Sequence, residues 1–425
     1  MTQTARHEST AALIGGPGQV LTDAEVTQFV HDQLGEVDVD GRSVCVVVPD
    51  GTRSCPLPLL LRAVHGALCG RASRITVLVA LGTHAAMTEE QLGRHLGYPP
   101  GRAAEVYPGT TIVNHEWWKP ETFVDLGAIS GERLAQLSGG RLQQGVAVRL
   151  NRAVVEHDVA LVVGPVFPHE VVGFSGGNKY FFPGVGGQDV IDMSHWLGAL
   201  ITSASIIGTR GVTPVRALID EAAALIPAQK LAFSAIVRSG SDDLHALAFG
   251  DTIASWNAAA DVAAQTHVRY LDEPVKRVLS VMPTKYDDIW TAAKGFYKLE
   301  PVVADGGEVI IYAPHITEIS AMHPEINEIG YHCRDYFLGQ WERFCGYHWG
   351  VLAHSTHLRG AGTWSPQDGE RYRVTVTLAT GIAEDVVRRA NLSYLDPAGV
   401  DVRALEADPG TFVVPNAGEV LYRLR

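Results

Sequence analysis

The chain has 425 residues, of which 46% are hydrophobic, so it is long enough to form more than one packed core. Its formal charge of −13 at pH 7 argues against nucleic acid or an anionic membrane surface as a partner, and no apolar segment reaches the length that spans a bilayer. The five cysteines show neither a metal-binding nor a disulfide spacing. We therefore expect a globular, cytoplasmic protein with reduced thiols, in which Cys45 is a buried core residue.

The first half of the chain alternates apolar strands with helices. It begins after residues 1–20, which we expect to form a flexible head without a signal peptide. Strands that alternate with helices form βαβ units and a mainly parallel sheet, so we predict an N-terminal α/β domain over residues 21–270. The predicted strands are 43–49, 74–81, 110–113 and 159–163, and the predicted helices are 22–34, 56–68, one that begins at Thr88, 214–225 and 251–267.

A second α/β unit follows Pro274, and we predict a C-terminal α/β domain over residues 271–425 with the active site in the cleft between the two domains. The segment 331–359 is rich in His, Trp and Arg but lacks HExxH or zinc-finger spacing, so we expect most of these side chains at a surface or an interface. The elements predicted here are strand 275–281, helix 288–296, strand 308–312 and strand-like runs over 372–380 and 410–415.

Polar side chains follow the C-terminal ends of four predicted strands. Asp50 and Arg53 follow the first strand, and His84, His115 and His169 follow the next three. Ligands of open α/β sheets bind outside these strand ends, so we expect the side chains to converge on one site. His115 is the weakest member of the set, with loop packing as its alternative role.

The segment 164–196 carries Lys179 and His195 on backbone interrupted by glycine-rich turns. A helix is predicted to begin near Asp189, with Asp192 in a capping-box arrangement. Bends of this kind cost conformational entropy and favour a functional role, although a strand-to-helix turn with a satisfied histidine explains the local pattern equally well.

Two neutral histidines in one pocket can act as general acid and base at pH 7, and on opposite faces of a carbon they would suit inversion of its configuration. Arg53 and Lys294 could together hold a carboxylate. Their alternative roles are an ion pair of Arg53 with Asp50 and a helix-terminal position for Lys294. His195 has no companion ligands at metal spacing, so a metal there would need most of its ligands from another molecule.

These residues together resemble the lactate racemase family, whose members carry the nickel-pincer nucleotide. The resemblance covers most of the chain and implies that Lys179 holds this cofactor covalently through a thioamide, while His195 binds its nickel. The motifs that carry it are Asp50-Gly51-Thr52-Arg53, Gly82-Thr83-His84, Pro168-His169, the loop 173–184 and His195. The other residues that it places around the cofactor are Asp50, Thr52, Ser175, Gly176 and Gly177.

The resemblance also implies a reaction. One of the pair His84 and His169 would take the C2 hydroxyl proton of a 2-hydroxy acid, whose carboxylate Arg53 and Lys294 hold, while the C2 hydride moves to the cofactor. A 2-keto acid would form, and the hydride would return to its other face. The residues that would line the substrate pocket are Trp290, Thr291, Trp341 and Tyr180.

The positions that face the substrate depart from the family pattern. Tyr180 follows the lysine where small or aliphatic residues are usual, and Trp290 and Thr291 replace a tyrosine–glutamine pair. We therefore expect a 2-hydroxy acid other than lactate, a longer polar one such as an aldonic sugar acid (gluconate-like).

Two other classes of protein compete with this interpretation. A carrier could bind nickel or the nucleotide without catalysis, although the two histidines disfavour it. A metal-dependent hydrolase would need three protein ligands on one metal, which the sequence does not offer. Association into a homo-oligomer is left open.

Overall fold

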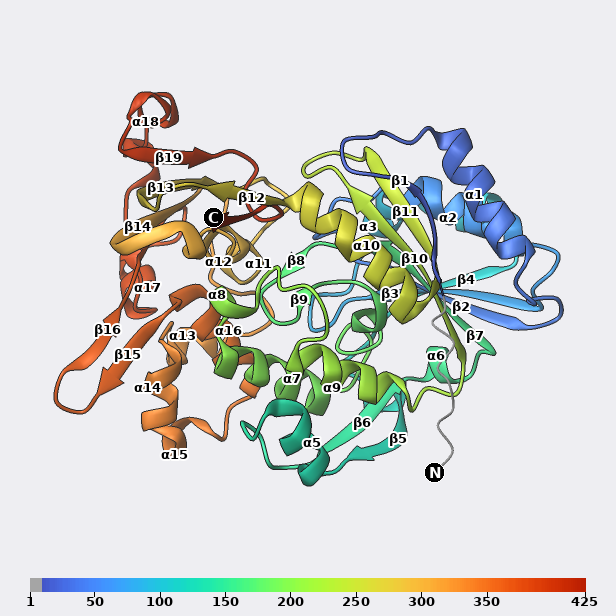
Figure 1. Cartoon of the computed structure of the whole chain (residues 1–425), viewed down its shortest axis with the longest axis horizontal. Helices are drawn as coiled ribbons and strands as arrows, with labels where there is room; N and C mark the ends of the chain where they lie inside the picture. The colour runs from blue at the N-terminus through green and yellow to red at the C-terminus, as the bar shows by residue number, and fades with distance from the viewer. Residues whose placement is uncertain (1–9) are drawn as a thin grey trace.

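The computed structural model describes residues 10–425, in which two main sheets are surrounded by helices (Figure 1). A seven-stranded sheet has the order β1-β11-β10-β7-β2-β3-β4, and a five-stranded sheet has the order β18-β17-β14-β13-β19. Their bounds are β1 Ala12–Gly15, β2 Ser43–Pro49, β3 Arg74–Ala80, β4 Thr110–Asn114, β7 Val159–Pro165, β10 Gln229–Val237, β11 Leu244–Asp251, β13 Val275–Val281, β14 Val303–Ala313, β17 Thr375–Thr380, β18 Ser393–Tyr394 and β19 Thr411–Val414.

Both sheets are mainly parallel, which confirms the predicted α/β class. Strands β10, β7, β2, β3 and β4 run parallel, whereas β1 and β11 are antiparallel to their neighbours. The five-stranded sheet is parallel throughout. Strand β2 is buried over Val44–Pro49 because a central parallel strand is covered on both faces, and its Cys45 is a core residue as expected.

The N-terminal head differs from expectation. Ala12–Gly15, which we expected in a flexible segment, pair with β11 as strand β1. Residues 1–9 of the predicted head lie outside the described residues.

The principal helices begin and end close to the predicted positions. Thr22 and Thr88 each close a capping box at the start of α1 and α3. The capping box expected near Asp189 is wrong, because α7 begins after Gly187 without a side-chain cap. The principal helices are α1 Asp23–Gly35, α2 Leu57–Leu68, α3 Glu89–Leu96, α7 Gln188–Ile201, α9 Pro214–Ala223, α10 Thr252–His267 and α16 Trp349–Arg359.

Shorter elements complete the chain. The helix predicted over 288–296 is divided in two, and each half places one side chain of the site described below. The remaining helices are α4 Ala103–Val106, α5 Gly131–Ser138, α6 Arg152–Val155, α8 Ser203–Ile206, α11 Ile289–Ala292, α12 Lys294–Tyr297, α13 Ile326–Ile329, α14 Arg334–Gly339, α15 Trp341–Phe344, α17 Glu384–Arg389 and α18 Val402–Ala407, with the 3-10 helices η1 Pro120–Thr122, η2 Gly177–Tyr180, η3 Glu300–Val302 and η4 Pro397–Gly399. The remaining strands are β5 Phe123–Ile129, β6 Val146–Asn151, β8 Pro168–His169, β9 Gly173–Phe174, β12 Val268–Leu271, β15 Gly362–Ser365, β16 Gly369–Tyr372 and β20 Leu421–Leu424.

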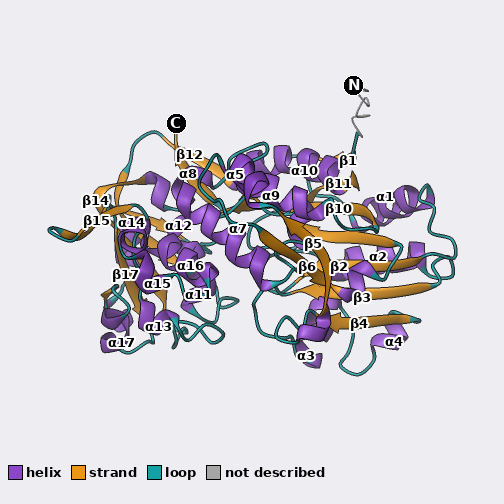
Figure 2. Ribbon diagram, turned by 90° about the horizontal axis from the view of Figure 1, so that it is seen from below, coloured by secondary structure: helices purple, strands orange, loops and turns teal. Residues whose placement is uncertain are grey.

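One hydrophobic cluster includes buried residues of both main sheets. Figure 2 shows the two sheets on either side of α7. Helices α7 and α16 pack together within this cluster, and Trp196 on α7 stacks on Trp341 at a ring-centroid distance of 5.2 Å. Because this core is shared, the division into domains at residue 270 stays a prediction. Within residues 10–425 no helix combines the length and apolar character needed to cross a membrane.

Candidate active site

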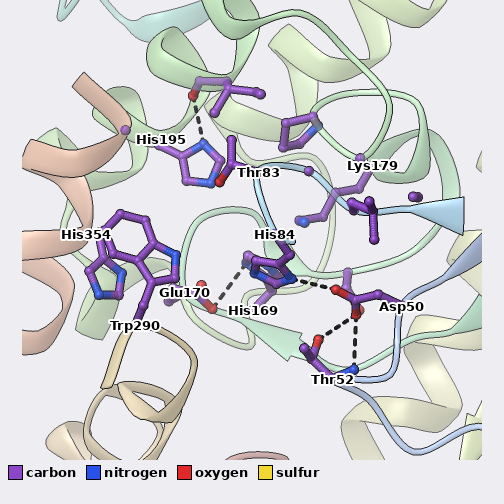
Figure 3. Close-up of a pocket in the computed structure, with 18 of the residues that line it drawn as sticks. Asp50, Thr52, Thr83, His84, His169, Glu170, Lys179, His195, Trp290 and His354 are labelled. Atoms are coloured by element: carbon purple, nitrogen blue, oxygen red, sulfur yellow. Dashed lines mark hydrogen bonds and ion pairs between the residues drawn. The ribbon is translucent and has the colours of Figure 1, made fainter. Parts of the chain in front are cut away.

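A pocket with a volume of about 370 Å³ lies at the C-terminal ends of β2, β3 and β7, and α11, α12 and α16 close its other side (Figure 3). Parallel strands bring the residues that follow them to one edge of the sheet, where ligands of α/β folds bind. The predicted site residues that line this pocket are Asp50, Thr52, Arg53, His84, His169, Ser175, Gly176, Lys179, Tyr180, His195, Trp290 and Lys294.

Three predicted site residues do not line the pocket. Gly177 has a positive φ and packs against Thr252 and Trp256, so it fixes the path of the loop 173–184, which carries Lys179. Thr291 donates a hydrogen bond of 2.8 Å from its hydroxyl to the Asp288 carboxylate, which caps α11. Trp341 stacks on Trp196 in the shared core.

His115 is also outside the pocket lining. It is fully buried, its Nδ1 lies 2.9 Å from the side-chain amide of Asn151, and its ring contacts Phe123 edge-on. Burial lowers the pKa of His115 to about 4. The environment of His115 therefore fits its alternative role, which is loop packing.

His84 is held by a carboxylate. Its Nδ1 lies 2.5 Å from Oδ2 of Asp50, whose Oδ1 accepts hydrogen bonds from the backbone amide and hydroxyl of Thr52 (Figure 3). Burial alone raises the pKa of Asp50, but His84 and the Thr52 hydrogen bonds outweigh it and leave the pKa below its usual range. An ionised acceptor at Nδ1 of His84 holds a proton on that nitrogen, so Nε2 is the ring nitrogen left for contact with a ligand.

His169 has two neighbours at the same ring nitrogen. Its Nδ1 accepts a hydrogen bond of 3.1 Å from the Val171 amide and lies 3.3 Å from Oε2 of Glu170. Burial, followed by the charges of Lys179 and Arg53, lowers the pKa of His169 well below its usual range. The imidazole is therefore neutral at pH 7.

His195 is suited to bind a metal. Its Nδ1–H donates a hydrogen bond of 2.7 Å to the carbonyl oxygen of Ile191, one turn earlier in α7, so Nε2 keeps its lone pair. Residues 10–425 contain no cluster of three or more His, Cys, Asp or Glu side chains arranged to hold a metal ion. A metal at His195 would therefore need its other ligands from a bound molecule.

Three cationic side chains share the pocket with three carboxylates. Burial lowers the pKa of Lys179 to about 8. Burial and then the charge of Arg53 lower the pKa of Lys294 to about 7. Asp50 and Glu170 are the anionic groups of the lining nearest to these cations, and both oppose the lowering of the lysine pKa values. Such a lining suits an anionic ligand in an otherwise acidic protein.

Some lining residues were not predicted. His354 and His357, which we expected at a surface or interface, are buried on α16 and line the pocket. Trp290 stacks between His354 and His323 at ring-centroid distances of 3.7 and 4.1 Å. The spacing of three residues between His354 and His357 within a helical stretch was the available signal, since it places both on one face. The other unpredicted polar or aromatic lining residues are Thr83, Trp117, Glu170, Gln188, Tyr297, Glu325 and His348.

The loop that carries Arg53 is fixed by a carboxylate from the far end of the chain. Glu419 is buried, accepts hydrogen bonds of 2.9 and 3.0 Å from the amides of Ser54 and Gly240, and pairs with Lys285 at 2.6 Å. Burial opposes ionisation, but Lys285 and the amide hydrogen bonds lower the pKa of Glu419 to about 2. The ion pair thus joins the ends of β2 and β10 to the loop after β13.

Comparison with known proteins gives related sequences and folds. Residues 27–208 match the family model for the lactate racemase N-terminal domain. The lactate racemases of Thermoanaerobacterium thermosaccharolyticum and Lactiplantibacillus plantarum are 25% and 26% identical over 158 and 168 residues. These stretches cover 36% and 39% of this chain but only 32% and 35% of the relatives, about a third of their length.

Two solved structures share the fold. A Thermotoga maritima protein superimposes with a TM-score of 0.88 at 30% identity, covering 96% of this chain and all of that one. The lactate racemase apoprotein of T. thermosaccharolyticum superimposes with a TM-score of 0.70 at 17% identity, over 97% of this chain and all of that one.

Fold and site together define an α/β protein with a pocket at parallel strand ends that is lined by cationic side chains and by imidazoles close to carboxylates. Residues 27–208 are similar to the lactate racemase N-terminal domain, and the chain shares its fold with the lactate racemase apoprotein.

Proposed function

We propose that this protein is a racemase or epimerase that inverts C2 of a 2-hydroxy acid with the nickel-pincer nucleotide as cofactor. The observation that carries the proposal is the common pocket of His84 and His169, each with a carboxylate near Nδ1, together with Lys179 and with His195, whose Nε2 is free. The similarity of residues 27–208 to the lactate racemase N-terminal domain, and of part of the chain to two lactate racemases, supports the reaction class.

The donor set fits this cofactor. Lys179, with a pKa of about 8, has an appreciable fraction of neutral amine for attachment to a thiocarboxyl group. His195 would supply the one protein ligand that a nickel ion held mainly by its own organic ligand requires. When bound, the cofactor would supply the hydride acceptor and donor that inversion at C2 requires.

The side chains of this protein would move the proton and hold the substrate. Arg53 and Lys294 bind the carboxylate and orient C2. The Nε2 atom of His84 or His169 removes the hydroxyl proton as the carbonyl forms, and the protonated imidazole returns it after hydride has come back. Burial of Lys294 and of His169 keeps the reacting atoms away from bulk water.

We propose a substrate other than lactate, a polar acid with a longer chain such as an aldonic acid. The stack of His323, Trp290 and His354 borders the pocket with imidazole nitrogens, and Nε2 of His323 contacts the Thr83 hydroxyl at 2.9 Å. Such groups can donate to or accept from additional substrate hydroxyls.

The test uses protein purified from cells that make the cofactor, incubated with lactate and with aldonic acids in D2O. We expect inversion at C2 without incorporation of deuterium at C2, because hydride does not exchange with solvent. We also expect the purified protein to contain nickel and to show a mass increase on Lys179. His84→Gln and His169→Gln should each lower the rate by about 100-fold or more while nickel is retained. Retention of nickel and the Lys179 adduct without turnover of any acid would favour the carrier alternative, and deuterium at C2 would contradict hydride transfer.

A further inference from the structure

Glu170 is a buried carboxylate that the proposed reaction leaves without a role. Its side chain is 14% exposed, it lines the pocket, and its Oε2 has no hydrogen-bond partner although it lies 3.3 Å from Nδ1 of His169 (Figure 3). A buried acceptor without a partner is costly and uncommon in folded proteins. Its position beside an acid–base histidine therefore indicates a partner that is present only in one state of the site.

The two neighbours of His169 Nδ1 require opposite positions of the imidazole proton. The Val171 amide at 3.1 Å can donate only to an unprotonated Nδ1, which places the proton on Nε2. The Glu170 carboxylate can accept only from a protonated Nδ1, which leaves Nε2 as a free base. Because Nδ1 cannot satisfy both neighbours at once, the choice between them sets the tautomer of His169.

The ionised form of Glu170 is the effective acceptor. Burial opposes ionisation, but His357, Lys294 and Arg53 outweigh it and lower the pKa of Glu170. The equivalent carboxylate on the other histidine is Asp50, which is already engaged with Nδ1 of His84 at 2.5 Å. The two imidazoles thus differ in one respect, since only His169 has a competing amide donor at Nδ1.

We propose that Glu170 is a positioning residue that selects the tautomer of His169. With Nδ1–H directed to Glu170, Nε2 accepts the substrate hydroxyl proton, and the carboxylate stabilises the imidazolium without taking a proton itself. With Nδ1 returned to the Val171 amide, Nε2–H serves as a donor to the substrate oxygen. The catalytic consequence rests on the proposed function, whereas the tautomer equilibrium is a property of the protein alone.

The tautomer can be measured without activity. In the full-length protein labelled with ¹⁵N-histidine, Nδ1 and Nε2 of His169 are assigned by comparison with His169→Gln. We expect the wild type to populate the Nδ1–H form and Glu170→Gln to shift His169 to the Nε2–H form, because the glutamine amide can donate to Nδ1. Glu325→Gln removes another carboxylate from the same pocket and should leave the His169 signals unchanged. A His169 that is entirely Nε2–H in the wild type, or unchanged in Glu170→Gln, would overturn the proposal.

Activity supplies the second measurement. Glu170→Gln should lower kcat by about 10- to 100-fold with a much smaller change in KM, since the substrate carboxylate is bound elsewhere. The signals of His157, which hydrogen-bonds Thr76 outside the pocket, report whether the variant is folded. If the wild type turns over no 2-hydroxy acid, the proposed function fails while the NMR comparison still decides the role of Glu170. An active Glu170→Gln with unchanged kcat would contradict the inference.

Discussion

Lys294 and Arg53 are both cationic, but burial affects their charge differently. The pKa of Lys294 falls to about 7, whereas a guanidinium keeps its proton at any pH that the protein tolerates. Only one of the two proposed carboxylate contacts is therefore sensitive to pH near neutrality.

We predict that kcat/KM for the 2-hydroxy acid decreases above pH 7. Lys294 loses its proton as the pH rises through its lowered pKa, so the free enzyme loses one of the two positive charges that would bind the substrate carboxylate. The decrease in kcat/KM should approach about tenfold per pH unit. Lys294→Arg should flatten this alkaline limb even if it lowers the maximal rate. Identical alkaline limbs in the wild type and Lys294→Arg, measured between pH 6 and 9, would exclude Lys294 as the titrating group.

At the scale of elements, the start of η2 determines where Lys179 lies. Gly177 has φ of +57°, and a Cβ atom there would lie 2.8 Å from the Thr252 carbonyl oxygen and 2.9 Å from Cβ of Trp256. Both neighbours belong to α10, so the loop 173–184 packs against this helix without room for a side chain at position 177.

We predict that Gly177→Ala destabilises the protein and lowers the attachment of cofactor to Lys179. Gly211→Ala is the matched control, because Gly211 also has positive φ (+84°) but no atoms within 4 Å of the added Cβ. The control should lose about 1 kcal/mol of unfolding free energy for the backbone conformation alone, and Gly177→Ala should lose about 1–3 kcal/mol more from overlap. Urea denaturation measures the free energy of unfolding of the two variants. Equal losses of unfolding free energy in Gly177→Ala and Gly211→Ala would contradict the packing argument.

The sequence predicted the elements that place Asp50, Arg53, His84 and His169 because β2, β3 and β7 are short β-branched runs that end in polar turns. It did not predict β10 and β11, whose Ala, Leu and Phe residues suit a buried helix equally well. Nor could it predict the lining by His354, since burial of a histidine on α16 depends on packing against α7. The pairing of each imidazole with a particular carboxylate depends on loop conformations that sequence periodicity does not encode.

At the scale of the whole molecule, Glu419 connects three distant segments. It contacts Ser54 after β2, Gly240 after β10 and Lys285 after β13, and the backbone oxygen of the same residue accepts from Lys298, which also donates to the Pro168 carbonyl oxygen. The segments that carry Arg53 and His169 are thereby fixed to the five-stranded side of the molecule.

We predict that Glu419→Gln lowers the free energy of unfolding at pH 7 by up to about 3 kcal/mol. The folded-state pKa of Glu419 is depressed from 4.5 to about 2, so its contribution is complete above pH 4.5 and is lost as the pH falls toward 2. In urea denaturation at pH 7, 5 and 3, the difference in unfolding free energy between wild type and Glu419→Gln should be smallest at pH 3. The exposed Glu406→Gln should change little at any pH, and a pH-independent difference for Glu419→Gln would contradict the ionic origin.

The position of Glu419 also sets an order of events during protein synthesis. All strands of the seven-stranded sheet have been translated by residue 251, yet the amides of Ser54 and Gly240 lack their buried acceptor until residue 419 emerges from the ribosome. A nascent chain can thus form the scaffold early, whereas the loop beside the lysine pocket matures last.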